Sequence, residues 1–399
     1  MEINGKFPIK FSKLGLAEWL VLSCVKRKIV FATEIQQVCI PAALKKKDLL
    51  IFSGTGTGKT LAFLLPALHL VEKSKQTLSV VVVVPTEELG FQISEIFNNL
   101  GRKKQISCCL VDKNLSIEKT KPPKRLSFVI TPKLFSLLYK KKCGNPGNIN
   151  TLLILDEFDL VIKNPFFNKF SLLVKIFNPI QILVFGVTFT KDTYSLTRAH
   201  FKNNFFFFHD KRNRFSALSR FNQEYIFCPF NAKLNYLKAI LSKESCTSGY
   251  PFRNNDVKII FFPSRKICES ISDILLNSGF QTIKLHQGMH RLERFLSIWI
   301  VKKKKSQILL STDSGIRGLD FPFVKSIINF NFPPRISTYI YRAGKTCRLD
   351  KTGHCISLIN QKEISLLDYF EKQTGVFLKK SEIIKENDIL PFITKNKNF

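Results

Sequence analysis

The sequence predicts an α/β protein with two domains, each built on a mostly parallel sheet flanked by helices. Short apolar runs alternate with helix-length segments along the 399 residues. Near-continuous apolar strands are typical of parallel sheets that are covered on both faces. Polar and Gly-rich residues follow several of these runs, and ligands of open α/β sheets bind at that edge.

The apolar runs fall into two sets, one in each half of the chain. The strands predicted for the first domain are Leu49–Phe52, Leu78–Val84, Phe128–Ile130, Leu152–Leu155 and Ile182–Phe185. The strands predicted for the second domain are Glu224–Phe227, Val257–Phe262, Thr282–Leu285, Ile308–Leu310, Ser326–Phe330 and Ile356–Ile359.

A polar and basic segment at Asp210–Phe221 separates the two sets. We therefore place a linker at residues 211–222, between a first domain at 1–210 and a second at 223–375, followed by a short polar tail at 376–399. At ~150 residues per domain, the length agrees with roughly two to three domains. The alternative is one large sheet with a surface loop, although ten strands is near the upper limit for an open sheet.

The charge balance indicates a polyanionic partner. Lys and Arg total 62 against 30 Asp and Glu, a formal net charge of +32. A field of this sign attracts nucleic acid or an acidic membrane surface. Apolar residues make up 45% of the chain, which argues against wholesale disorder.

Other classes of protein are disfavoured by what the sequence lacks. The best apolar run, Leu61–Val71, contains Pro66 and is shorter than the ~18 residues that span a bilayer. Residues 1–20 do not have the pattern of a secretory signal. The ten Cys include no C-x-x-C pair, and the six His show no zinc spacing. We expect an intracellular, reducing compartment and no membrane partner.

The strongest motif follows the first predicted strand and opens a predicted helix. It consists of Ser53, Gly54, Thr55, Gly56, Thr57, Gly58, Lys59 and Thr60. In such a P-loop, backbone N–H groups surround phosphates, the Lys neutralises the β- and γ-phosphates and the last hydroxyl holds Mg²⁺. Ser53 replaces the usual first Gly, but it is small enough for the turn. The competing interpretation is a plain Gly-rich turn.

A second motif places two consecutive carboxylates at the end of the strand Leu152–Leu155. Asp156 would coordinate Mg²⁺, and Glu157 would polarise the attacking water. An acidic pair after a strand is by itself common on protein surfaces. The P-loop upstream favours the catalytic interpretation.

At this point the sequence resembles the DEAD-box RNA helicases of superfamily 2, over roughly residues 11 to 375. Phe11 and Gln36 are similar to the family's Q motif, at about residues 9–37, in which an aromatic ring stacks on adenine and the amide reads its edge. An amide suits adenine because it donates and accepts together. Taken alone, the two residues would be unremarkable core and surface positions.

Further segments follow in the order of the family's motifs. They are Pro85–Leu89, Thr131–Leu134, Phe185–Thr188, Ile260–Phe261, Leu285–Met289 with Arg294, Ser311–Asp313, Arg317–Asp320 and Tyr341–Arg348. The resemblance implies two tandem RecA-like domains with ATP between them, and ATP and Mg²⁺ as cofactors.

The resemblance also implies a role for each matching residue. The catalytic residues would be Lys59, Asp156, Glu157 and Arg348, the last as the arginine finger. Asp320 and Lys345 would join the Q motif and the P-loop in binding ATP, and Mg²⁺ would be held by Thr60 and Asp156. RNA phosphates would be contacted by Thr86, Thr131, Arg294 and Thr312. Coupling between the domains would depend on Asp159, Thr188 and Tyr341.

Several positions depart from the family pattern. Glu87 stands where the family has an Arg that meets RNA phosphate, and Lys133 and Lys345 keep the charge of Arg without its bidentate fork. The family's paired-glycine RNA motif is not found near Leu110–Lys113. Phe158, Gly186-Val187 and Tyr341 replace Ala, Ser-Ala and His. We hypothesise that Gly186 leaves space for Phe158, and that Tyr341 reaches Asp159.

Within the family, Phe11–Leu16 with Trp19-Leu20, and Tyr225–Pro229, look most like the ribosome-biogenesis branch that acts on small-subunit ribosomal RNA precursors. This resemblance implies RNA and pre-ribosomal proteins as partners and the nucleus or nucleolus as the location, and we expect a monomer. One alternative is an RNA-binding clamp or scaffold with a degenerate, weak ATPase. Another, a small-molecule P-loop kinase, does not account for the second domain.

Overall fold

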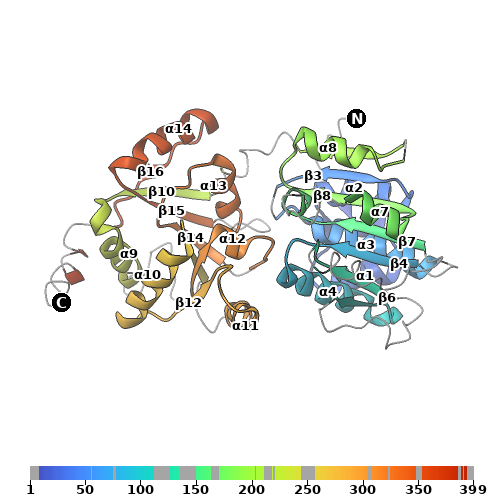
Figure 1. Cartoon of the computed structure of the whole chain (residues 1–399), viewed down its shortest axis with the longest axis horizontal. Helices are drawn as coiled ribbons and strands as arrows, with labels where there is room; N and C mark the ends of the chain where they lie inside the picture. Colours follow the sequence, from blue (N-terminus) through green and yellow to red (C-terminus); the bar gives the residue numbers. More distant parts are fainter. Residues whose placement is uncertain are drawn as a thin grey trace. The chain divides into compact units, whose positions relative to one another are not determined.

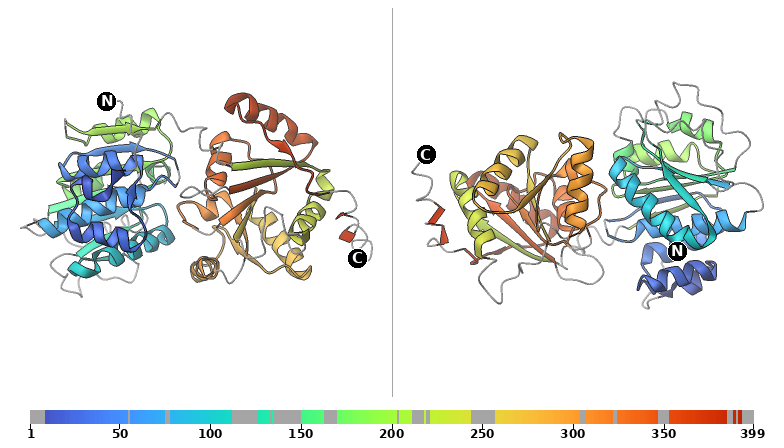
Figure 2. Two further views of the ribbon diagram at one scale, coloured as in Figure 1. Left: turned by 180° about the vertical axis from the view of Figure 1, so that it is seen from behind. Right: turned by 90° about the horizontal axis from the view of Figure 1, so that it is seen from below.

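The computed structural model describes residues 9–54, 56–74, 78–111, 126–132, 134, 150–162, 170–202, 204–210, 218, 221–243, 257–303, 307–321, 324–346, 353–384, 388–389 and 391–392. It divides the chain into two compact units, Met1–Lys211 and Arg212–Phe399. Helices cover both faces of the sheet in each unit (Figure 1, Figure 2). Most of the predicted linker lies outside the described residues.

The first unit contains a seven-stranded parallel sheet in the order β5-β6-β4-β7-β8-β3-β9. Its strands are β3 (Leu49–Phe52), β4 (Leu78–Val83), β5 (Ser107–Leu110), β6 (Leu126–Ile130), β7 (Asn150–Leu155), β8 (Gln181–Gly186) and β9 (Phe206–His209). A separate antiparallel pair joins β1 (Ile9–Lys10) to β2 (Phe31–Ala32).

Alternate residues of each strand enter two different cores, because successive side chains point to opposite faces. Leu49 and Ile51 belong to the cluster under the first four helices, whereas Leu50 and Phe52 belong to the cluster on the other face. The helices on the first face are α1 (Glu18–Lys26), α2 (Glu34–Leu44), α3 (Lys59–Lys73) and α4 (Glu87–Gly101). Those on the other face are α6 (Phe158–Val161), α7 (Phe170–Phe177) and α8 (Lys191–Arg198).

The second unit repeats the plan, with a seven-stranded parallel sheet in the order β12-β13-β11-β14-β15-β10-β16. The strands are β10 (Phe221–Phe227), β11 (Val257–Phe262), β12 (Thr282–Leu285), β13 (Ile308–Thr312), β14 (Val324–Asn329), β15 (Gly353–Ile359) and β16 (Lys379–Lys380). The helices are α9 (Lys233–Lys243), α10 (Arg265–Asn277), α11 (Arg291–Lys302), α12 (Asp313–Ile316), α13 (Ile336–Ala343) and α14 (Ile364–Thr374).

Two findings bear on the predicted organisation. The strands form two separate sheets, so the alternative of one large sheet is wrong. Strand β16 pairs with β10, so the second sheet extends into the segment expected to be a polar tail. In the described part of the chain, no helix is both long and apolar enough to cross a membrane.

Candidate functional site

The P-loop connects β3 to α3, and its glycines are required by the backbone. Gly56 and Gly58 have φ angles of 75° and 92°, in the left-handed region that favours glycine. A Cβ atom on Gly58 would lie 2.5 Å from Nε2 of Gln36. The loop can therefore place its N–H groups at the start of α3, where an anion is favoured.

Lys59 is the first residue of α3, and its side chain is buried against the P-loop. Its Nζ donates hydrogen bonds of 3.0 Å to the backbone oxygens of Ser53 and Gly54. The Thr57 hydroxyl closes the same turn with a bond of 3.0 Å to the Gly54 oxygen. Two backbone carbonyls of the loop thus hold the ammonium group against the loop. Phosphate oxygens of a bound nucleotide would replace these carbonyls as its partners. Thr55 lies outside the described residues.

Gln36 is tied directly to the P-loop. Its Nε2 donates to the Gly58 oxygen at 3.1 Å, and its Oε1 accepts from the Thr33 backbone N–H at 2.9 Å. The Thr33 hydroxyl donates to the Thr57 oxygen at 2.7 Å. One donor and one acceptor position of the amide remain to read adenine. Thr33 was not among the predicted site residues, although the T-x-x-Q pattern at a helix start signals its capping role.

Phe11, the other residue of the predicted Q motif, is buried. Its side chain is only 1% exposed and belongs to the hydrophobic core under the first four helices. The short 3-10 turn Phe11–Leu14 points the ring inward. The stacking of Phe11 on adenine stays a prediction.

The two carboxylates of the acidic motif follow β7. Asp156 is buried, and burial, reinforced by the negative charge of Glu157, raises the pKa of Asp156 to about 7, against the opposing effect of Lys59. Glu157 has a φ of 51°, and its N–H donates to Oδ1 of Asp156 at 2.9 Å. A buried carboxylate with a second one beside it favours a bound cation. Its oxygens, with the Thr60 hydroxyl, are the hard ligands that Mg²⁺ prefers.

Asp159 joins the acidic motif to the segment that follows β8. Its Oδ1 accepts from the Val187 N–H at 3.1 Å, and its Oδ2 accepts from the Thr188 hydroxyl at 3.2 Å. A Cβ on Gly186 would lie 3.0 Å from the Phe52 ring and 3.2 Å from Oδ1 of Asp159. Gly186 therefore makes room for Phe52 and Asp159.

The hypothesis that Gly186 makes room for Phe158 is therefore wrong. The atoms nearest to a Cβ on Gly186 do not include those of Phe158. Phe158 is fully buried in the same cluster as Phe52, with its ring centroid 5.8 Å from that of Phe170.

The three threonines predicted to contact RNA share one local role. Thr86, Thr131 and Thr312 each follow a strand, and each hydroxyl accepts a backbone N–H three residues ahead, at 3.2 to 3.4 Å. In the first unit, Thr86 and Thr131 come after the neighbouring strands β4 and β6, whose last residues Val83 and Ile130 pair with each other. Helix-start amides and hydroxyls at such positions suit backbone phosphates.

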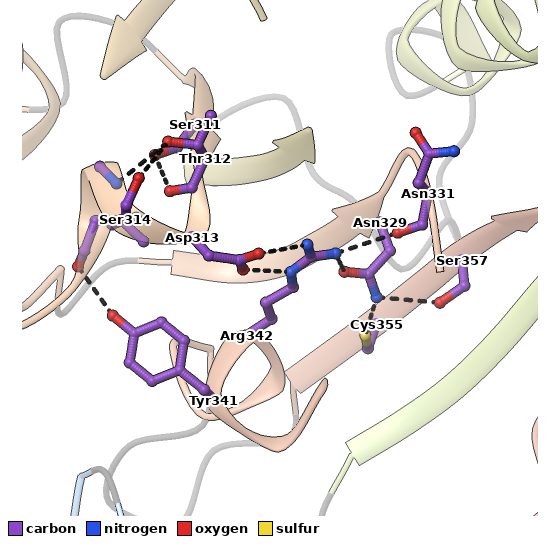
Figure 3. Close-up of polar contacts among 12 residues, drawn as sticks. Ser311, Thr312, Asp313, Ser314, Asn329, Asn331, Tyr341, Arg342, Cys355 and Ser357 are labelled. Atoms are coloured by element: carbon purple, nitrogen blue, oxygen red, sulfur yellow. Dashed lines mark hydrogen bonds and ion pairs between the residues drawn. The ribbon is translucent and has the colours of Figure 1, made fainter. Parts of the chain in front are cut away.

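The second unit contains a buried polar network that the prediction did not include (Figure 3). Arg342 binds both carboxylate oxygens of Asp313, with Nε to Oδ1 at 2.6 Å and NH2 to Oδ2 at 2.8 Å. Its NH1 donates to Oδ1 of Asn329 at 2.9 Å. The signal available in the sequence was a polar Asn inside an apolar strand, together with the motifs that contain Asp313 and Arg342.

Other predicted residues of the second unit point inward. Arg294 is buried, and its guanidinium donates to the backbone oxygens of His286 at 2.7 Å and Gly315 at 3.2 Å. This geometry makes Arg294 a positioning residue for two loops, and its predicted contact with RNA phosphate stays a prediction. Lys345 donates to the Leu319 oxygen at 2.9 Å, next to Asp320. Lys133 and Arg348 lie outside the described residues.

Tyr341 also has a partner within its own unit. Its hydroxyl donates to the Ile316 oxygen at 3.1 Å, and its ring lies 4.5 Å from Nζ of Lys345. The predicted contact with Asp159 joins residues of different units and stays a prediction.

Comparison with known proteins defines the class of this fold and site. The profile of the DEAD/DEAH box helicases matches residues 33–196, and that of the helicase conserved C-terminal domain matches residues 232–350. The ATP-dependent RNA helicase DDX47 of Drosophila melanogaster is 32% identical over 377 residues, which cover 92% of this chain and 71% of the relative. The chain therefore belongs to the DEAD/DEAH box helicase family.

Two further comparisons agree with this assignment. Human "Probable ATP-dependent RNA helicase DDX49" is 29% identical over 96% of this chain and 80% of its own length. The structure of S. cerevisiae Dbp5 bound to RNA and ADP BeF3 has a TM-score of 0.80 at 23% identity, over 97% of this chain and 99% of that one. At this identity, the structural likeness shows the shared fold of tandem RecA-like domains.

Proposed function

We propose that this helicase is an RNA-stimulated ATPase that uses ATP and Mg²⁺ to unwind or remodel RNA locally. The observation that carries the proposal is the P-loop itself, in which Lys59 lies at the phosphate position and influences the buried Asp156. Gln36 supports ATP as the nucleotide, because its amide is fixed against the same loop.

We assign a separate role in ATP hydrolysis to each of four residues of the first unit. Lys59 would exchange its two carbonyl partners for β- and γ-phosphate oxygens, and Glu157 would orient the attacking water. Thr60 and Asp156 would hold Mg²⁺, which when bound neutralises charge on the phosphates. Arg348 of the second unit stays assigned as the arginine finger, and Asp320 as the residue near the ribose.

RNA would be held mainly through its backbone. Thr86 and Thr131 follow the neighbouring strands β4 and β6, and Thr312 has the same local hydrogen bond in the second unit. Contacts of this kind bind RNA without reading its sequence. Arg294 would support this surface by fixing the loops around Gly315.

The resemblance to the ribosome-biogenesis branch supports a biological role in ribosomal RNA processing. We expect the protein to act as a monomer, in the nucleus or nucleolus, together with pre-ribosomal proteins. Crosslinking of RNA bound in cells would test this assignment. Recovery of ribosomal RNA precursors is the expected result, and recovery of messenger RNA alone would contradict it.

A strand-displacement assay tests the biochemical proposal. A short RNA duplex with a single-stranded extension should separate when ATP is present, and Lys59→Ala should fail to separate it. Lys372→Ala, an exposed change on α14, is the matched control. Displacement without ATP, or equal displacement by Lys59→Ala, would contradict the proposal.

A further inference from the structure

The first unit carries a concentration of positive charge at its helix ends. Helices that connect parallel strands run back along the sheet, so their carboxyl ends gather where the strands begin, opposite the P-loop edge. The carboxyl ends of α3 and α4 lie at this edge, and the end of α1 joins them through a side-chain contact. Together these ends supply seven exposed cations, which we call the helix-end cluster: Lys26, Arg27, Lys28, Lys73, Arg102, Lys103 and Lys104.

Side-chain contacts join these helix ends into one surface. Arg27 of α1 donates through NH2 to the Asn99 oxygen near the end of α4, at 2.9 Å. Lys104, just beyond α4, pairs with Glu72 of α3 at 3.1 Å. The cations of the three helices are therefore neighbours in space, although they come from distant parts of the sequence.

A shallow hollow of about 570 Å³ lies beside the cluster. Its lining combines Arg102 and the polar residues Asn98, Asn99, Gln105 and Ser107 with Ile106, Cys108 and Cys109. The Asn98 amide donates to the Cys108 oxygen at 2.9 Å and accepts from the Cys108 N–H at 2.7 Å, which joins α4 to β5 on this surface. The exposed amide side chains of Asn99 and Gln105 lie next to the cationic rim.

The charge exceeds what helix stability explains. A cation in the last turn stabilises a helix by about 0.3–1 kcal/mol through the macrodipole. Runs of three cations, at 26–28 and 102–104, add mutual repulsion instead. Within the described part of the chain, Lys104 with Glu72 is the ion pair that these seven side chains make. Most of the positive field therefore stays available to a partner.

We propose that the helix-end cluster is a second RNA-binding surface, which holds the phosphate backbone of RNA that flanks the remodelled segment. The proposal rests on the proposed function of the protein. Cations bind phosphates without reading sequence, and neutral amides can hydrogen-bond to phosphate or to the ribose hydroxyl. The surface lies at the opposite edge of the sheet from Thr86 and Thr131, so it adds to the predicted RNA path.

The test compares two variants with equal loss of charge. The cluster variant carries Lys26→Gln, Lys28→Gln, Arg102→Gln and Lys103→Gln. The control carries Lys362→Gln, Lys372→Gln, Lys379→Gln and Lys380→Gln, all exposed in the second unit. Binding is measured with a single strand of about 10 nucleotides, and with the same strand joined to a hairpin of about 20 base pairs.

The cluster variant should bind the longer RNA about tenfold more weakly, with a salt slope shallower by about 0.7 for each phosphate that the variant no longer neutralises. Its affinity for the short strand and its maximal ATPase rate should match the wild type, and the control should keep the wild-type affinity for both RNAs. If the cluster variant unfolds at a lower temperature than the wild type, Lys26→Gln with Lys28→Gln is compared instead with Lys379→Gln with Lys380→Gln.

Two outcomes would overturn the proposal. Equal losses in the cluster and control variants would mean that net charge, and not this surface, determines affinity. Loss of binding to polyglutamate without loss of binding to the longer RNA would assign the surface to an acidic protein instead. Failure of the proposed function is distinguishable, because the wild type would then bind neither RNA and show no RNA-stimulated ATPase.

Discussion

Arg342 binds both carboxylate oxygens of Asp313, at 2.6 and 2.8 Å, and this ion pair connects α13 to the start of α12. Breaking a buried ion pair by removing one partner leaves an uncompensated charge, at a cost of about 3–5 kcal/mol. Asp313 is partly exposed, which reduces this cost. We therefore predict that Arg342→Ala lowers the free energy of unfolding of the second unit by about 2–3 kcal/mol, measured by urea denaturation.

Arg335→Ala provides the control, because Arg335 is an exposed residue just before the same helix. Arg342→Lys should recover only part of the loss, since an ammonium cannot bind a carboxylate bidentately. Similar stability of Arg342→Ala and Arg335→Ala would show that the network contributes little.

Gln36 should determine the choice of base. Its amide suits adenine, whereas guanine presents the opposite arrangement of donor and acceptor. The wild type should hydrolyse ATP in strong preference to GTP, and Gln36→Ala should reduce that preference. Gln37→Ala is the matched control, because Gln37 lies on the same helix and its side chain donates to the Ala32 oxygen of β2. Equal use of GTP by the wild type would refute the assignment.

Glu87 places a negative charge at the start of α4, next to Thr86. If RNA phosphate passes here, Glu87→Arg should tighten RNA binding and steepen its salt dependence by about 0.7 in log–log slope. The same change removes a favourable charge from a helix start, so the unfolding free energy should fall by about 0.3–1 kcal/mol. An RNA affinity that does not change in Glu87→Arg would place Glu87 away from the RNA.

His69 connects α3 to the segment before α1. Its Nδ1 accepts a 3.0 Å hydrogen bond from the Ala17 N–H, which requires the neutral ring. Burial, reinforced by Lys73 and opposed by Glu72, lowers the pKa of His69 below its ordinary value of 6.5. The unfolded chain therefore binds this proton more readily than the folded one. The contribution of His69 to stability should be complete above pH 6.5 and should decline as the pH falls below it.

The loss should be about 1 kcal/mol, the typical net value of one hydrogen bond. It can be measured as the change in unfolding free energy between pH 7.5 and pH 5, compared with that of His69→Gln. The variant should show a smaller change than the wild type. Identical pH profiles would exclude His69 as the titrating group.

The central strands of both seven-stranded sheets were predicted, whereas three of the four edge strands were missed. The predicted strands Leu49–Phe52 and Val257–Phe262 match β3 and β11 at both ends, because buried central strands are continuously apolar. The edge strands β5, β9 and β16 were missed, and the edge strand β12 was predicted as Thr282–Leu285. One side of an edge strand is exposed, so polar residues such as Ser107 and Lys379 are tolerated there.

The candidate site shows the same division. The P-loop and the acidic motif depend on local spacing, so the sequence predicts them directly. The burial of Phe11, and the inward direction of Arg294 and Lys345, depend on packing between distant segments, which no local pattern records. The bond between Arg342 and Asp313 spans 29 positions, and only the fold brings the two residues together.

The central claim is that Lys59 and its loop drive an ATPase that responds to RNA. The most direct test is single-turnover ATP hydrolysis with and without single-stranded RNA, for the wild type and for Lys59→Ala. We predict that RNA accelerates hydrolysis by the wild type, and that Lys59→Ala abolishes hydrolysis but still binds RNA. Wild-type hydrolysis that RNA does not change, or full activity in Lys59→Ala, would contradict the account.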